Sequence, residues 1–135
     1  MTTQRTPLPL LPGYDPGRAA EWDYVPNQQA LADNAPEWAR AHRIKPAASD
    51  EFRIHALLID VQKDFCHPEG TLYVAGRSGT GAVEDNRRLA EWTYRNLDVI
   101  TDITTTMDTH FAYQIFFPSF WIDENEAPLT PHRVI

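Results

Sequence analysis

The sequence contains little cysteine, little basic charge and no long apolar run. Its one cysteine, Cys66, excludes an internal disulfide and suits a reducing cytoplasm. Asp and Glu outnumber Lys and Arg by 19 to 12, and the formal net charge of −7 argues against nucleic acid or an anionic membrane as a partner. No apolar stretch approaches the roughly 20 residues that span a bilayer, and the proline-interrupted start does not resemble a signal peptide. These absences predict a cytoplasmic protein with neither a nucleic-acid nor a membrane partner.

Proline divides the chain by composition. Seven of the eleven prolines lie in residues 1–46, so we interpret residues 1–50 as an arm that wraps a neighbour and not as an independent domain. Short helices are expected within it at residues 27–32 and 36–42, the second with a proline at its first position. Docking of the arm onto the body of the protein or onto a second subunit would bury its large aromatic side chains, Trp22, Tyr24 and Trp38.

The remaining residues, 51–135, have the pattern of an α/β protein. Residues 55–60 form a short apolar run that ends in an acid, which is typical of a strand buried on both faces in a parallel sheet covered by helices. A short extended piece is expected at residues 71–74 and a helix at 82–96. Residues 99–107 are rich in β-branched side chains and predict a second strand. Strand, crossover helix and strand together predict a right-handed βαβ unit.

Two acidic residues, Asp60 and Asp108, each follow a predicted strand. In open α/β sheets, ligands bind at the carboxyl ends of the strands, so the fold would place both carboxylates at one pocket. The alternative is that each acid caps the turn that begins a loop. Position alone does not decide between these interpretations.

Other residues are candidates for binding a metal ion or for acting as a nucleophile. Asp108 and His110 are two positions apart, so in an extended chain they point to the same side, and His132 is a third possible ligand. Two nitrogen donors and one oxygen donor suit zinc or iron(II), although an Asp-x-His pair also arises by chance. Cys66 precedes His67, but adjacent side chains seldom face each other, and we interpret this cysteine as a small buried residue.

Residues 56–74 resemble the opening strand and loop of the cysteine hydrolases that include nicotinamidases and isochorismatases. The shared pattern is an apolar strand, Asp-Val-Gln-x-Asp-Phe, a loop with glycine, and Leu-x-Val. Residues 106–110, Thr-Met-Asp-Thr-His, resemble the second strand of nicotinamidases, and residues 131–134, Pro-His-Arg-Val, resemble the stretch that brings a third metal ligand. The resemblance covers about residues 53–135. It implies the N-terminal portion of a three-layer α/β/α sandwich with a mostly parallel sheet, preceded here by the proline-rich arm.

The resemblance also implies a chemistry. The family uses a catalytic Asp, Lys and Cys, and Asp60 matches the Asp, which takes the thiol proton and then passes it to the departing amine. The divalent metal of nicotinamidases would be held by Asp108, His110 and His132. Isochorismatase-type members generally lack that metal, so these residues favour a nicotinamidase-like amidase acting on a small-molecule amide.

The departures from the family concern the other two catalytic residues. The only lysines, Lys45 and Lys63, and the only cysteine, Cys66, stand at positions that do not match the family's Lys and nucleophile. We therefore expect a missing C-terminal segment or a second chain to supply both, and residues 1–135 alone to be inactive. The aromatic segment 111–121 implies a different pocket and a substrate that the sequence does not identify.

Two further hypotheses stay open. The chain could be a non-catalytic fragment whose open sheet edge and aromatic arm serve assembly, and it would then form an oligomer. It could also be a metal-assisted hydrolase that uses Asp108, His110 and His132 without any cysteine.

Overall fold

A computed structural model of the chain describes residues 5–109, 111, 114–115 and 117–129. Two strands, β1 (His55–Leu58) and β2 (Asp102–Thr105), pair in parallel, with Ala56 opposite Ile103. The helix α3 (Gly81–Arg95) lies between them in the chain, within one residue of the predicted helix at each end. Helices and a parallel strand pair therefore make a mixed α/β architecture, as the apolar runs predicted.

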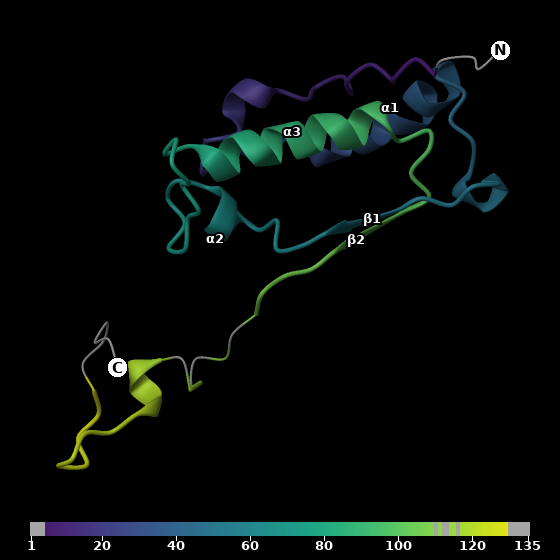
Figure 1. Cartoon of the computed structure of the whole chain (residues 1–135). Coiled ribbons are helices and arrows are strands. Elements are labelled where there is room, and N and C mark those ends of the chain that lie inside the picture. The colour runs from purple at the N-terminus through teal and green to yellow at the C-terminus, as the bar shows by residue number, and fades with distance from the viewer. Residues whose placement is uncertain (1–4, 110, 112–113, 116, 130–135) are drawn as a thin grey trace.

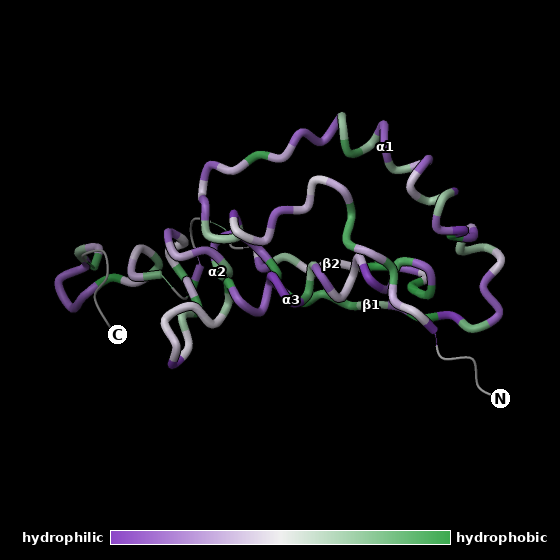
Figure 2. Tube along the Cα trace, turned by 90° about the horizontal axis from the view of Figure 1, so that it is seen from above, coloured by the Kyte–Doolittle hydropathy of each residue, from purple (hydrophilic) through white to green (hydrophobic). Residues whose placement is uncertain are grey.

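The helices lie on one side of the strand pair. Figure 1 shows α1 (Gln28–Ala41) and α3 on the same side of β1 and β2, and Figure 2, seen from above, shows α3 over the strands and α1 farther to one side. Ala56 is buried, but Leu57 and Ile59 are 55% and 66% exposed. The expectation that the strands are buried on both faces is thus wrong for the described part of the chain, because only one layer of helices covers the sheet.

The prediction of two separate helices in the arm is also wrong. The chain forms one continuous helix, α1, with Pro36 inside it. A proline removes one backbone N–H donor from a helix and usually kinks or breaks it, yet α1 is continuous from Gln28 to Ala41. The Asn27 side chain caps the first turn by accepting from the Ala30 N–H at 3.0 Å, and the Asn34 amide donates to the Ala30 carbonyl at 2.7 Å.

Residues ahead of α1 pack on the C-terminal half of α3. The Arg5 guanidinium donates to the Arg95 carbonyl at 2.8 Å, and the Leu8 N–H donates to the same oxygen at 3.1 Å. Leu8 is one of the buried apolar side chains, and the Tyr14 ring meets Tyr94 edge-on with ring centroids 5.2 Å apart. One short 3₁₀ turn, η1 (Pro16–Arg18), lies in this region, and a second, η2 (Ala47–Ser49), lies between α1 and β1. None of the described helices combines the length and apolarity needed to cross a membrane.

A single helical turn, α2 (Lys63–Cys66), follows β1 and was not predicted. The chain then turns back, so that the Val74 N–H donates to the Phe65 carbonyl at 3.0 Å. Residues 71 and 72 lie in a turn and residues 73 and 74 have no regular secondary structure, so no strand forms where the sequence predicted a short extended piece. Behind α2, His67 is buried and its ring meets Trp22 of the arm at 5.0 Å between centroids.

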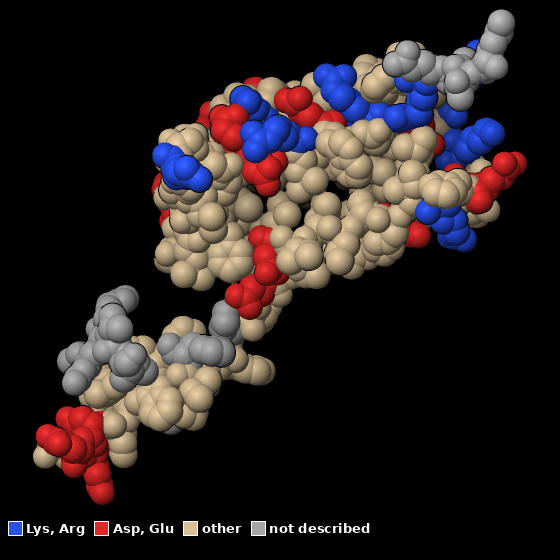
Figure 3. All heavy atoms as spheres, viewed as in Figure 1, with Lys and Arg blue, Asp and Glu red and all other residues tan. Residues whose placement is uncertain are grey.

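Beyond β2 the described chain continues away from the body (Figure 1). It contains a 3₁₀ turn, η3 (Pro118–Phe120), and an isolated antiparallel bridge between Ile122 and Pro128. The Trp121 indole N–H donates to the Ile115 carbonyl at 2.8 Å. Figure 3 shows acidic side chains at the far end of this segment, which are Asp123, Glu124 and Glu126.

Candidate active site

Asp60 lies two residues beyond β1, at the carboxyl end of the strand pair. Its backbone φ of 53° falls in the left-handed region, which Asp tolerates better than most residues but which still costs free energy. The Asp60 N–H donates to Thr106 Oγ1 at 3.0 Å, and Thr106 Oγ1 donates to Asp60 Oδ1 at 2.8 Å. Backbone and carboxylate of Asp60 are therefore held by one hydroxyl group on the neighbouring strand end.

Asp108 lies three residues beyond β2 and reaches the same edge of the sheet. Its N–H donates to Gln62 Oε1 at 2.9 Å, and the Gln62 N–H donates to the Asp60 carbonyl at 2.8 Å. Gln62 thus bridges the loops that carry the two predicted carboxylates. The side chain of Asp108 is exposed, whereas that of Asp60 is half-buried.

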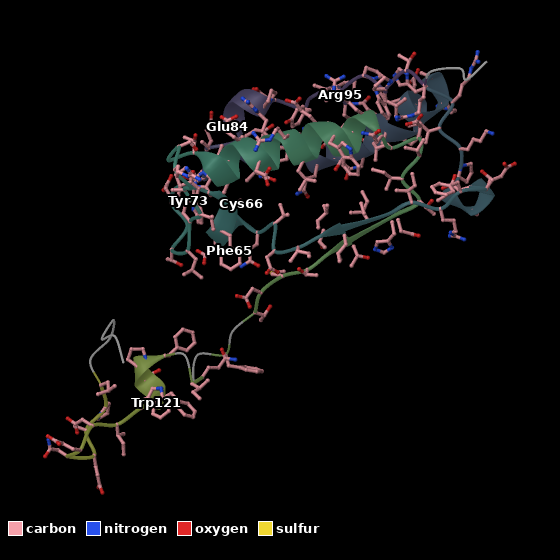
Figure 4. The ribbon with its side chains drawn as sticks, viewed as in Figure 1. Phe65, Cys66, Tyr73, Glu84, Arg95 and Trp121 are labelled. Atoms are coloured by element: carbon pink, nitrogen blue, oxygen red, sulfur yellow. The ribbon has the colours of Figure 1, made fainter. Side chains whose placement is uncertain are left out.

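A pocket of about 490 Å³ opens between the end of β1, α2 and the N-terminal half of α3. Most of its wall is apolar, and the polar groups that converge on it are Asp60, Cys66, Asp85, Asn86 and Arg88. An apolar cavity with a few convergent polar groups is the usual form of a small-molecule site. Figure 4 shows Cys66 on α2, close beneath α3.

Cys66 shares this pocket with Asp60, but its surroundings do not activate it. Partial burial raises the pKa of the Cys66 thiol and the nearby Asp85 carboxylate adds to the increase, while a backbone hydrogen bond at Gln62 opposes it. A thiol with a raised pKa is mostly protonated at neutral pH and is a weak nucleophile. The environment therefore suits the structural role that the sequence suggested for Cys66.

The two lysines of the chain lie away from the pocket wall, although both are within the described residues. Lys63 on α2 donates to the carbonyl of Trp22 and lies 4.2 Å from the centroid of its indole ring. Lys45 lies near the start of β1, at the opposite end of the strand pair. Neither lysine lines the pocket that contains Asp60.

The expected metal site falls largely outside the described residues. His110 and His132 are not among them, and only Asp108 is. Within residues 5–109, 111, 114–115 and 117–129, no three His, Cys, Asp or Glu side chains gather closely enough to hold a metal ion. The ligand set Asp108, His110 and His132 thus stays a prediction.

Sequence reasoning gave no role to Thr106 or Gln62, although both lie inside the motifs that carry the resemblance. Each is separated by 46 residues from its partner, Asp60 or Asp108. The register of the two strands would have indicated the first pair, because Thr106 follows Thr105, which lies opposite Leu58. Comparison with protein-family models, with curated proteins and with solved structures gives no significant match.

Proposed function

We propose that this chain is the Asp-bearing part of a cysteine hydrolase that cleaves a C–N amide bond of a small molecule, in the manner of nicotinamidases. One observation carries the proposal: Asp60 lines a mostly apolar pocket at the carboxyl end of parallel strands, where α/β proteins bind ligands. The Asp-Val-Gln-x-Asp-Phe motif around Asp60 supports the same function.

In this proposal the Lys and Cys of the catalytic trio come from outside residues 1–135. Asp60 takes the proton of the incoming thiol, and the thiolate attacks the amide carbonyl carbon. The C–N bond then breaks, and Asp60 returns the proton to the departing nitrogen. Water next attacks the acyl-enzyme thioester while Asp60 accepts a proton from it. The C–S bond breaks, and Asp60 passes this proton to the departing thiolate, which releases the acid and restores the thiol.

The proposed metal ligands are one carboxylate, on Asp108, and two imidazoles, on His110 and His132. This donor set is chemically suited to zinc or iron(II) with positions left open. A bound ion would supply a Lewis acid that orients the substrate next to Asp60. The isochorismatase-like alternative needs no metal, so retention of activity in the presence of a chelator would favour it.

The test isolates the tagged chain under native conditions and compares native with denaturing mass on the same sample. Ammonia release from nicotinamide is then measured for the wild type, Asp60→Asn and the control Asp102→Asn, an exposed residue at the other end of the strand pair. We expect a second polypeptide with a Lys and a Cys, and a loss of about 10²-fold or more in Asp60→Asn alone, the contribution of general acid–base catalysis. Turnover by residues 1–135 alone, or full activity of Asp60→Asn, would contradict the proposal.

A second candidate function, assembly without catalysis, is favoured by the bare face of the strand pair. Leu57 and Ile59, two positions apart and therefore on one side of the strand, expose 55% and 66% of their surface. Contiguous exposed apolar surface marks interaction sites. In the same native mass measurement, a homo-oligomer without amide turnover would favour this candidate over the hydrolase.

A further inference from the structure

The hydroxyl of Thr106 makes two hydrogen bonds to one residue, Asp60. A hydroxyl has a single proton to donate and lone pairs with which to accept. Because Thr106 Oγ1 accepts from the Asp60 N–H at 3.0 Å, its own proton is directed to Asp60 Oδ1 at 2.8 Å. The two bonds close a ring that holds both the left-handed backbone of Asp60 and the orientation of its carboxylate.

Thr106 is itself held in place by the sheet. Its N–H donates to the Leu58 carbonyl at 2.9 Å, which continues the strand ladder one step past the last pair, Leu58 and Thr105. A group that orients a catalytic side chain is effective when a rigid element supports it. Thr106 meets this condition because it extends β2 and does not belong to a free loop.

We infer that Thr106 is a positioning residue for Asp60 and that it selects Oδ2 as the oxygen that receives the thiol proton, an inference that rests on the proposed function. Oδ1 is occupied by the Thr106 hydroxyl, while Oδ2 has no hydrogen-bond partner in the described part of the chain. The S–H bond breaks as an O–H bond forms at Oδ2, and this proton later moves to the departing amine nitrogen. Misplacement of a reacting group by about 1 Å can cost about 10²-fold in rate.

The test compares Thr106→Val, which keeps the β-branched shape without the hydroxyl, with Thr106→Ser, which keeps the hydroxyl. In the chain alone, NMR measures hydrogen exchange at the Asp60 amide and the ¹³C resonance of the Asp60 carboxylate. Thr106→Val speeds that exchange about twofold to tenfold, the value of one hydrogen bond, and shifts the resonance. Thr106→Ser restores both, and the backbone amide of residue 106, bonded to the Leu58 carbonyl, keeps its protection factor in all three proteins.

In the assembled enzyme, Thr106→Val lowers kcat for amide hydrolysis with little change in KM, and Thr106→Ser recovers kcat. Unchanged Asp60 exchange and resonance in Thr106→Val would overturn the inference, as would an unchanged kcat. Asp60→Asn separates this failure from failure of the proposed function, because it removes the base and leaves a carbonyl oxygen for Thr106. Suppose that Asp60→Asn retains turnover while Thr106→Val still speeds hydrogen exchange at the Asp60 amide. Then the proposal that Asp60 is the base of a cysteine hydrolase is wrong, but the two hydrogen bonds between Thr106 and Asp60 are supported.

Discussion

Among the glycines of the chain, Gly70 is the one at which an added methyl group would come closest to another backbone atom. A Cβ at residue 70 would lie 2.1 Å from the carbonyl oxygen of Asp64 and 2.7 Å from its carbonyl carbon. Both atoms belong to the backbone of α2, so no side-chain rotation relieves the contact, and the loop or the helical turn must move. The two hydrogen bonds that Thr71 donates to Asp64 Oδ1, at 2.8 and 3.0 Å, lie at the same junction and would be distorted.

We expect Gly70→Ala to lower the free energy of unfolding by about 3 kcal/mol, the upper end for overpacking, because the clash is with backbone. Urea denaturation followed by tryptophan fluorescence measures this change, since Trp22 packs on His67 beside the loop. Gly79→Ala is the control: its φ is 79°, but no atom lies within 4 Å of the added Cβ, so only backbone strain of about 1–2 kcal/mol applies. A Gly70→Ala protein as stable as the wild type, or less affected than Gly79→Ala, would refute the reasoning.

Two other predictions follow from the pKa shifts. The Arg5 guanidinium lowers the pKa of Asp98 in the folded protein below its ordinary value of 3.8. The ion pair therefore stabilises the folded state fully above pH 3.8, and this stabilisation is lost as the pH falls through the lowered pKa of the folded protein. Arg5→Gln should therefore lower the free energy of unfolding by about 0.5–1 kcal/mol at pH 7, a small value because the two side chains are 36% and 25% exposed to solvent. The loss should be clearly smaller near pH 2. Thermal unfolding at both pH values tests this, and an equal loss at both would contradict it. Because burial raises the pKa of Cys66, its thiol should react with Ellman's reagent on the order of tenfold more slowly than free cysteine at pH 7.5, and at the free rate in urea. A native thiol as reactive as free cysteine would contradict that assignment.

Part of the candidate site could be predicted from the sequence. The position of Asp60 and Asp108 after two apolar or β-branched runs was enough to place both at one sheet edge, because parallel strands connected by a helix end on the same side. Motif spacing also predicts that the two lysines and Cys66 do not occupy catalytic positions; the raised pKa of the Cys66 thiol and the place of Lys45 near the start of β1 agree with this, but the prediction itself stays untested. Asp60 as the base and the metal ligands stay predictions.

The sequence by itself determined the local elements: α3 and the locations of β1 and β2, whose residue patterns report burial along one segment of chain. Only the tertiary structure decided that Thr106 holds Asp60, that α1 continues through Pro36, and that Leu57 and Ile59 are exposed. The physical reason is that the Thr106–Asp60 bond joins segments 46 residues apart, and that the exposure of Leu57 and Ile59 depends on how many helical layers cover the strands, which is one in the described part of the chain. Periodicity within one segment records which side chains are apolar, but it does not record which partner each will meet.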